Sequence, residues 1–315
     1  MKQFTKLADV PDREHLIERA FECKHSPHAW RTLGNGRILG MVFFNPSLRT
    51  RVSTHRAASL LGMDVVAMTV GADVWTLETR DGTIMDAAAA EHIREAAAVM
   101  GRYVDVLGIR AFARLHDRLE DYAETVLERF AELSGVPIVS LESATRHPLQ
   151  SLADIMTIEQ FKRYERPRVV LTWAPHPKAL PQAVPNSFAE WTLAMGYDVV
   201  IAHPPGYELD ERFTNGAAIT TDQNEALDGA DFVYAKNWSS YRDYGKILSQ
   251  DMRWQITPEK MALTREGYFM HCLPIRRNMI ASDAVLDSPR SIVVEQAANR
   301  VPAAQAVLRT MLESL

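Results

Sequence analysis

Cysteine is scarce in this sequence, which has only Cys23 and Cys272 among 315 residues. The two stand far apart, and neither has a close cysteine or histidine partner at metal-ligand spacing, so the sequence offers no disulfide framework and no zinc motif. It also lacks a run of eighteen uncharged apolar residues, and the stretch that begins at Met1 has no apolar core of signal-peptide length. We therefore expect a cytoplasmic protein that is neither secreted nor membrane-spanning and binds no metal.

An excess of positive charge is also absent. The chain has 35 basic and 40 acidic residues, a net charge of −5, and the two signs are mixed throughout. Without a cationic stripe the sequence does not favour binding to nucleic acid or to an anionic membrane. No P-loop occurs, and Gly34, Gly36 and Gly40 precede the apolar run that they would have to follow in a dinucleotide loop. We expect no cofactor.

What the chain does contain is an alternation of apolar, strand-like runs with longer helical patterns. This alternation is typical of βαβ units and predicts two doubly wound parallel-sheet α/β domains. The expected strands span residues 38–44, 64–70, 103–110, 136–142, 168–173, 198–202, 230–236 and 267–273. The expected helices span residues 48–61, 91–101, 117–134, 149–164 and 302–315. Four prolines predict an extended loop over 173–185.

The most informative stretch is Asn45-Pro46-Ser47-Leu48-Arg49-Thr50-Arg51, which follows a strand pattern and opens a helical one. Ser47 is a good N-cap, and the free N–H groups of the first helical turn favour an anion. Arg49 adds a planar fork of donors that matches phosphate oxygens, and Thr50 adds a hydroxyl. The stretch predicts a phosphate site, although an ordinary strand, turn and capped helix with solvated arginines would give the same string.

Polar residues follow other expected strands as well. Ligands of open parallel sheets bind beyond the carboxyl ends of the strands, so residues in these positions are expected to face one active-site cleft between the two domains. The residues concerned are Ser47 to Thr50, Arg110, Glu142 with His147, His176, Lys236 and Cys272.

Three motifs in order resemble the aspartate/ornithine carbamoyltransferase family along essentially the whole chain. Ser47-Leu48-Arg49-Thr50-Arg51 is similar to its carbamoyl phosphate signature, and His147-Pro148-Leu149-Gln150 to its second motif. His271-Cys272-Leu273-Pro274 is similar to the third motif, as found in the ornithine-type branch. Aspartate carbamoyltransferases would have threonine at Leu48 and a histidine-proline pair at Cys272, so that branch is disfavoured.

Lys236 departs from ordinary ornithine carbamoyltransferases, which have an aspartate and a Ser-Met-Gly element after this strand. A lysine repels the free α-ammonium of ornithine and suits a carboxylate. The sequence therefore resembles the branch that acts on N-acylated ornithine, with succinylornithine as the favoured acceptor and acetylornithine as the alternative. The acetyl type has glutamate and the succinyl type has proline at the position of Ala90, which matches neither. Ala90 lacks the negative charge that would oppose a succinyl carboxylate, and this favours the succinyl acceptor. In the acetyl branch the lysine that corresponds to Lys260 can be carboxylated.

The resemblance also implies roles for individual residues. Those implied to act in catalysis are Arg49, Arg110, His147 and Cys272, where Cys272 has no visible adjacent base and is expected to position the substrate rather than attack it. Carbamoyl phosphate would be bound by Ser47, Leu48, Arg49, Thr50, Trp75, Arg110, His147, Gln150, Cys272, Leu273 and Arg300. The N-acylornithine would be bound by Glu142, His176, Lys236 and Arg276.

The implied reaction transfers a carbamoyl group from carbamoyl phosphate to the side-chain amine of N-succinylornithine in arginine biosynthesis. The implied domains are a carbamoyl phosphate-binding domain over 1–146, to which a C-terminal helix over 298–315 returns, and an N-acylornithine-binding domain over 147–297. The resemblance further implies a homotrimer in which Trp75 reaches a neighbour's site, and a knot in the second domain. A non-catalytic protein that binds a phosphorylated metabolite is the competing class.

Overall fold

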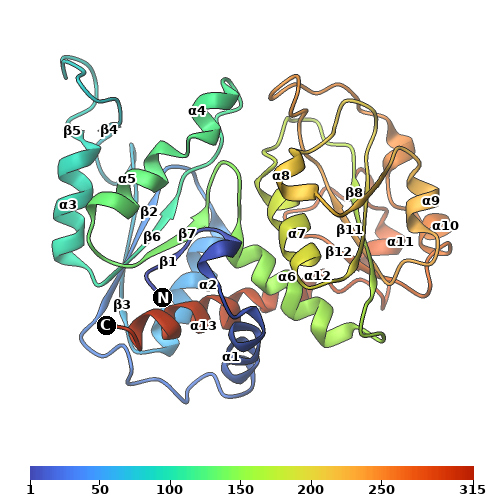
Figure 1. Cartoon of the computed structure of the whole chain (residues 1–315), viewed down its shortest axis with the longest axis horizontal. Helices are drawn as coiled ribbons and strands as arrows, with labels where there is room; N and C mark the ends of the chain where they lie inside the picture. Colours follow the sequence, from blue (N-terminus) through green and yellow to red (C-terminus); the bar gives the residue numbers. More distant parts are fainter. The chain divides into compact units, whose positions relative to one another are not determined.

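The computed structural model describes residues 1–315, which divide into two compact units, each built on one five-stranded sheet (Figure 1). Unit 1 consists of residues 1–114, 119–149 and 300–315, and unit 2 of residues 115–118 and 150–299. Every strand pair in both sheets is parallel, which confirms the predicted fold class of two parallel-sheet α/β domains. No helix combines the length and the apolar character needed to cross a membrane.

The sheet of unit 1 has the strand order β1-β7-β6-β2-β3. The strands are β1 (Gln3–Phe4), β2 (Ile38–Phe43), β3 (Asp64–Thr69), β6 (Val106–Arg110) and β7 (Ile138–Glu142). A separate two-stranded sheet pairs β4 (Leu77–Glu78) with β5 (Glu91–His92). The four longer strands of the main sheet were predicted from their apolar runs. β2, β6 and β7 are buried along nearly their whole length, whereas β3 is only half-buried.

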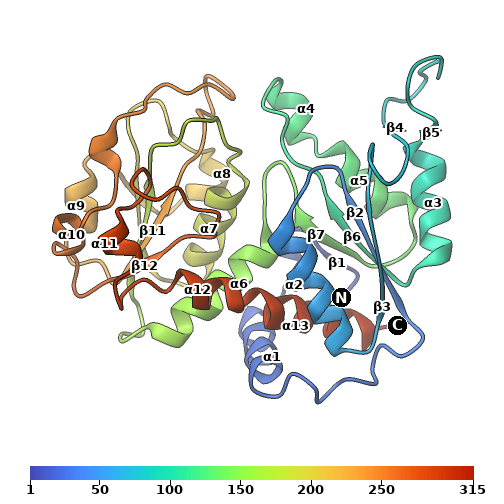
Figure 2. The same cartoon turned by 180° about the vertical axis from the view of Figure 1, so that it is seen from behind.

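Helices cover both faces of this sheet. On one face α1, α2 and α13 pack together, although α13 is some 240 residues beyond α2 in the sequence (Figure 2). On the other face α3 and α5 pack on a core that includes Val42, Leu107 and Phe130. The helices of unit 1 are α1 (Arg13–His25), α2 (Leu48–Leu60), α3 (Ile93–Tyr103), α4 (Arg118–Tyr122, whose first residue belongs to unit 2), α5 (Thr125–Leu133) and α13 (Arg300–Leu312), with a 3-10 turn at Leu7–Asp9.

The sheet of unit 2 has the strand order β10-β9-β8-β11-β12. Its strands are β8 (Arg168–Trp173), β9 (Asp198–Ala202), β10 (Ala218–Thr220), β11 (Phe232–Lys236) and β12 (Tyr268–Met270). Figure 1 shows α7 and α9 on opposite faces, and both contact β8 and β9. The helices are α6 (Pro148–Phe161, whose first two residues belong to unit 1), α7 (Ala183–Ala194), α8 (Glu211–Thr214), α9 (Gln223–Leu227), α10 (Pro258–Met261), α11 (Asp283–Leu286) and α12 (Val293–Ala298), with a 3-10 turn at Met252–Trp254.

Two predictions about local structure were wrong. The extended loop expected over 173–185 ends early, because α7 begins at Ala183 and contains Pro185 in its first turn. A first-turn proline is tolerated there, since the N–H that it lacks would have no partner within the helix. The single helix expected over 117–134 is two helices, α4 and α5, separated by Glu124, whose φ of 48° lies in the left-handed region.

Candidate functional site

Ser47 caps the helix that follows β2, as the sequence predicts. Its backbone is extended (φ −156°, ψ 117°), and its Oγ accepts the N–H of Thr50 at 3.3 Å. The cap fixes where α2 begins and leaves the first-turn N–H groups at the carboxyl end of β2. This geometry supplies the N–H donors and the positive end of the helix dipole that an anion requires.

Two arginines lie in unit 1 together with this helix start. Arg49 is half-buried in the first turn, and its Nε is buried without a hydrogen-bond partner. Arg300, the first residue of α13, is 6% exposed, and its Nη2 donates to the Thr50 hydroxyl at 2.7 Å. A buried donor that has no acceptor is costly, so Arg49 is suited to an anionic ligand rather than to packing.

A second cluster in unit 1 joins Arg110, Glu142 and His147. The ladder between β6 and β7 shifts register after Ile109, so that Arg110 pairs with Glu142. Arg110 Nη1 donates to Glu142 Oε2 in a buried ion pair, and the guanidinium lies 4.4 Å from the ring centroid of Phe112. Such irregularities re-aim side chains next to functional sites, and Glu142 itself has a strained φ of 149°.

His147 is held in its neutral form. Burial lowers its pKa well below 6.5, and the nearby charges of Arg300 and Arg110 lower it further. Its Nε2 lies 3.7 Å from Glu142 Oε2, and its Nδ1 is buried without a hydrogen-bond partner. A neutral imidazole offers one donor and one acceptor, so His147 can donate to an oxygen without carrying a charge of its own.

In unit 2 the structure brings together His176, Lys236 and Arg276. Arg276 Nε donates to His176 Nε2 at 3.1 Å, so the other ring nitrogen carries the proton, and Nδ1–H donates to the Lys178 carbonyl at 2.9 Å. The pKa of His176 is lowered by burial and also by the charges of Lys236 and Arg276, which lie near it. Two cations and a ring held beside them suit a carboxylate ligand.

The other predicted residues of unit 2 belong to a buried hydrogen-bond network. Gln150 on α6 donates to Asp154 at 2.7 Å, and Gln296 on α12 donates to the same Asp154 oxygen at 2.7 Å. Leu273 has a φ of 55°, and its N–H donates to His271 Nδ1 at 2.8 Å. These two residues flank Cys272, which is buried. Sequence reasoning missed Asp154 and Gln296, although the spacing of four residues between Gln150 and Asp154 signals a contact on one helix face.

The predicted residues Trp75 and Ala90 lie near the small β4–β5 sheet of unit 1, and Lys260 lies on α10 of unit 2. Trp75 stands between β3 and β4, is 58% exposed, and its indole N–H donates to Glu91 at 2.8 Å. Ala90 is exposed just before β5, where its N–H donates to the Thr76 carbonyl. Nζ of Lys260 donates to Gln223 and to two backbone carbonyls, and burial lowers the pKa of this lysine. Three acceptors suit an amine rather than an anionic carboxylated lysine.

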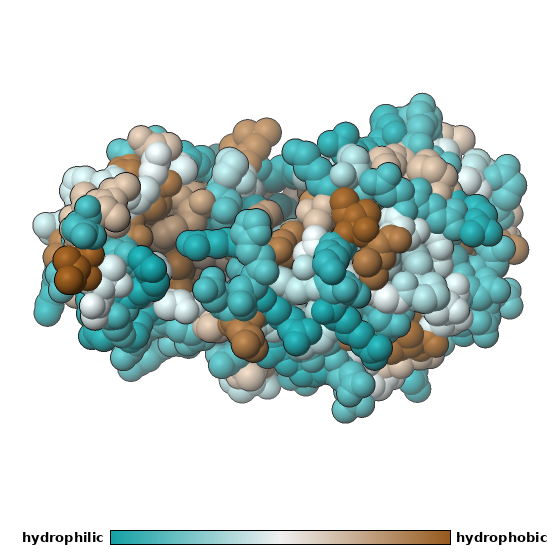
Figure 3. All heavy atoms as spheres, turned by 90° about the horizontal axis from the view of Figure 1, so that it is seen from above, coloured by the Kyte–Doolittle hydropathy of each residue, from teal (hydrophilic) through white to brown (hydrophobic).

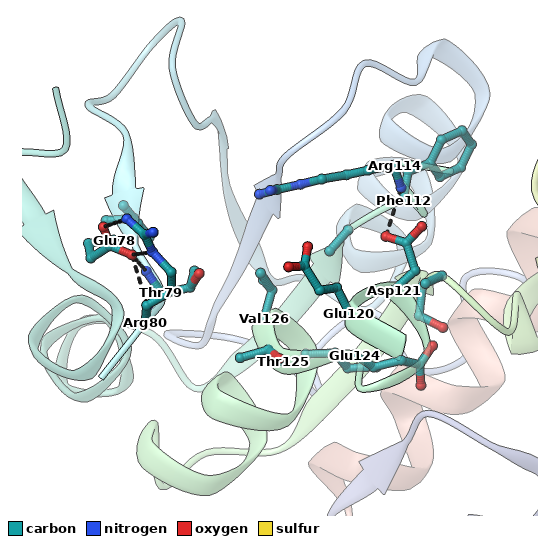
Figure 4. Close-up of a pocket in the computed structure, with 15 residues that line it drawn as sticks. Glu78, Thr79, Arg80, Phe112, Arg114, Glu120, Asp121, Glu124, Thr125 and Val126 are labelled. Atoms are coloured by element: carbon teal, nitrogen blue, oxygen red, sulfur yellow. Dashed lines mark hydrogen bonds and ion pairs between the residues drawn. The ribbon is translucent and has the colours of Figure 1, made fainter. Parts of the chain in front are cut away.

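Unit 1 contains a cavity of about 610 Å³ (Figure 4). It is lined by β4, by the segments that follow β6 and β7, and by α4 and α5. Carboxylates outnumber cations in its wall, where Glu78, Glu120 and Glu124 stand with Arg80 and Arg114. The cavity is thus unsuited to phosphate and includes neither Arg49 nor the Ser47 turn.

Comparison with family models identifies the class to which this fold and these residues belong. The model of the aspartate/ornithine carbamoyltransferase carbamoyl-P binding domain matches residues 2–160, and that of the Asp/Orn binding domain matches residues 181–311. The chain belongs to the aspartate/ornithine carbamoyltransferase family, and is therefore of a class that transfers carbamoyl groups. The predicted family and enzyme class are confirmed.

Individual relatives show which members of the family the chain is similar to. The chain is 51% identical to the N-succinylornithine carbamoyltransferase of Bacteroides thetaiotaomicron over an alignment of 317 positions, which covers 100% of both chains. It is 40% identical to the N-acetylornithine carbamoyltransferase of Xanthomonas campestris pv. campestris, with 88% of each covered. A glutamate-to-alanine variant of N-acetyl-L-ornithine transcarbamylase, complexed with carbamyl phosphate and N-succinyl-L-norvaline, superposes with a TM-score of 0.93. The variant is 37% identical to this chain, and the superposition covers 99% of this chain and 100% of the variant.

Proposed function

We propose that this protein transfers the carbamoyl group of carbamoyl phosphate to the side-chain amine of N2-succinyl-L-ornithine, giving N-succinylcitrulline and phosphate in arginine biosynthesis. The observation that carries the proposal is the 51% identity over the whole chain to a protein named N-succinylornithine carbamoyltransferase. A cytoplasmic location is part of the proposal and agrees with two cysteines that form no disulfide.

The residues of unit 1 bind and activate carbamoyl phosphate in this proposal. The first turn of α2, with Arg49 and Arg300, binds the phosphate and stabilises the negative charge that grows on it as it leaves. Arg110 and neutral His147 donate to the carbamoyl oxygen, which gains negative charge when the amine attacks. A neutral His147 suits this role, because a third full cation beside Arg110 and Arg300 would be electrostatically costly.

The residues of unit 2 bind the acceptor and the carbamoyl NH₂. His176, Lys236 and Arg276 bind the carboxylates of the N-acylated amino acid, which is supported by the hydrogen bond between Arg276 and His176 and by the charge of Lys236 beside that ring. Glu142 of unit 1 is engaged by Arg110, and a second lone pair of its carboxylate can accept the amide N–H of the acceptor. Gln150 accepts from the carbamoyl NH₂.

The amine must lose a proton before it can attack. At a pKa near ~10.4, about one alkyl amine in 2,500 is neutral at pH 7, a handicap of roughly 4–5 kcal/mol. Alignment of two bound substrates offsets this, since effective molarities in the best intramolecular models lower barriers by about 7–11 kcal/mol. Direct attack needs no covalent intermediate, so Cys272 has a positioning role.

Ala90 supports the succinyl acceptor. The resemblance aligns it with the position that carries glutamate in the acetyl type, and alanine brings no charge to repel a second carboxylate. Replacement of a glutamate in N-acetyl-L-ornithine transcarbamylase by alanine, proline, valine or serine gave complexes with N-succinyl-L-norvaline. The succinyl acceptor is thus the proposal, and acetylornithine is the alternative that the assay below tests.

We also propose that the protein is a homotrimer, in which Trp75 contributes to the site of a neighbouring subunit. Figure 3 shows apolar patches scattered over a mainly hydrophilic surface, and the exposed apolar side chains of unit 1 that support the trimer lie around β4, β5 and α3. Ile84 is 82%, Tyr103 67% and Trp75 58% exposed, and Trp75 also lines an apolar cavity of about 320 Å³. Light scattering at micromolar concentration tests this state, and a monomeric active protein would contradict it.

The deciding experiment is a competition assay. Citrulline formation from carbamoyl phosphate is measured with equal concentrations of succinylornithine and acetylornithine, and then with ornithine or aspartate alone. We expect N-succinylcitrulline as the main product. A preference for acetylornithine would move the protein to the other N-acyl activity, and turnover of free ornithine alone would refute both. Binding of carbamoyl phosphate without turnover of any acceptor would indicate a sensor.

A further inference from the structure

A fully buried carboxylate in unit 2 organises two elements that the proposed reaction uses. Asp154 on α6 has an exposed fraction of 0%, and its Oδ1 accepts hydrogen bonds from the side-chain amides of Gln150 and Gln296, both at 2.7 Å. Burying a carboxylate is costly unless donors surround it. None of the roles assigned above to substrate contacts explains why a carboxylate stands here.

A carboxylate can only accept, so it selects one orientation of each amide that it binds. The nitrogen must face Asp154, and the amide oxygen must face away. For Gln296 the consequence is visible, because its Oε1 accepts the N–H of His271 at 2.9 Å. His271 Nδ1 in turn accepts the N–H of Leu273 at 2.8 Å. Asp154 therefore reaches, through Gln296, the segment that contains Cys272.

The same selection acts on Gln150. With its Nε2 bound to Asp154, Gln150 presents Oε1 as an acceptor, and its side chain is 1% exposed. The carbamoyl NH₂ is a donor and needs acceptors. A flipped amide would place an NH₂ against the carbamoyl NH₂, so the orientation of this one side chain separates a favourable contact from an unfavourable one.

We propose that Asp154 is the positioning residue for carbamoyl recognition: it fixes the amide of Gln150 as an acceptor and, through Gln296, sets the backbone of residues 271–273. This inference rests on the proposed function. Asp154 itself touches no substrate and acts through the two glutamines. Tyr234 lies beside Asp154 and Cys272. Burial and these two neighbours raise the pKa of Tyr234, so that the tyrosine hydroxyl stays protonated.

The test compares carbamoyl phosphate with acetyl phosphate, which has a methyl group in place of the NH₂. Dissociation constants for both are measured in the full-length protein. In wild type we expect carbamoyl phosphate to bind more tightly, because only its NH₂ donates to Gln150. In Asp154→Leu the preference should fall about tenfold, and in Asp154→Asn, which retains one oxygen acceptor without the charge, about threefold. Binding of acetyl phosphate should change little.

Thr157→Val is the matched control. Thr157 lies nearly one turn further along α6, is fully buried, and its Oγ1 accepts from Asn299 at 2.9 Å. This variant should lose stability and keep the preference. A merely structural role for Asp154 would weaken both ligands equally and leave their ratio unchanged in both variants, which would overturn the proposal. If Asp154→Leu does not fold, Asp154→Asn decides alone.

A double-mutant cycle tests the route through Gln150. In a Gln150→Leu background, Asp154→Asn should change the ratio by less than about 1.5-fold, because the acceptor that it orients is already gone. An undiminished effect in that background would refute the route. Wild-type turnover of N-succinylornithine with unchanged ratios in the variants would refute the inference alone, whereas no turnover with any acceptor would refute the proposed function.

Discussion

Arg300 Nη2 donates to the hydroxyl of Thr50 at 2.7 Å, which joins the first turn of α2 to the first residue of α13 across 250 positions of sequence. Both side chains are buried, with exposed fractions of 6% and 1%. The bond ties the helix start that we propose as the phosphate site to the last helix of the chain. It also orients a second guanidinium within the group of residues that we assign to carbamoyl phosphate.

Removal of the Thr50 hydroxyl should cost stability. In Thr50→Val a buried N–H of Arg300 loses this acceptor, and we expect the free energy of unfolding to fall by about 1–3 kcal/mol. Thr50→Ser keeps the hydroxyl, so its free energy of unfolding should fall by less than about 1 kcal/mol. Urea denaturation of the three proteins measures the difference, and equal losses in both variants would mean that the bond contributes nothing.

Arg49→Ala should lose carbamoyl phosphate use and keep its fold. The side chain is half-buried with an unpartnered Nε, so it contributes little packing and is expected to lose two charge-assisted bonds to phosphate. At roughly 1.5–3 kcal/mol each, these predict a fall in kcat/KM of about 100-fold or more. Arg56→Ala on the exposed face of α2 is the control. Kinetics like those of the control would remove the phosphate role.

The depressed pKa of His147 predicts a dependence of stability on pH. Because the folded pKa lies well below 6.5, the unfolded chain binds more protons than the folded one below that value. Stability from this group is thus complete above about pH 6.5 and is lost as the pH falls, with a slope of up to about 1.4 kcal/mol per pH unit. Urea denaturation from pH 7.5 to 5 measures it.

His147→Gln should flatten this slope relative to wild type, since the variant has no proton to bind at this position. His55→Gln, at an exposed histidine of α2, is the matched control for the loss of an imidazole. Parallel slopes in all three proteins would show that His147 does not titrate differently in the two states.

Ala90→Glu should shift the acceptor preference. A carboxylate here would oppose the succinyl carboxylate, so we expect kcat/KM for succinylornithine to fall about tenfold or more while that for acetylornithine is retained or rises. Ala90→Gln matches the size without the charge and separates repulsion from crowding. If both variants lose succinylornithine equally, the effect is steric.

Cys272→Ser should retain turnover within about tenfold, because direct transfer uses no thiol nucleophile. Rapid quench without acceptor should give no stoichiometric burst of phosphate. A burst in wild type that Cys272→Ser abolishes would establish a covalent route instead.

Much of the fold is readable from short stretches of sequence. Strands β2, β3, β6, β7, β8, β9, β11 and β12 all fall within predicted runs, because buried parallel strands are continuous apolar stretches bounded by turn residues. Strands β1 and β10 were missed, since two or three residues give no period and are strands only because a neighbour pairs with them. The break at Glu124 was missed for a similar reason, as one left-handed residue leaves the apolar pattern on either side unchanged.

The candidate site also has one part that the sequence determines and another that depends on tertiary contacts. The sequence by itself determined the Ser47 cap, because a cap is a contact over three residues between a side chain and the next helical turn. Only the tertiary structure decided that Thr50 meets Arg300, that a register shift pairs Arg110 with Glu142, and that Gln296 donates to Asp154. Those contacts join segments up to 250 positions apart, and no local pattern encodes which distant polar group satisfies a buried one.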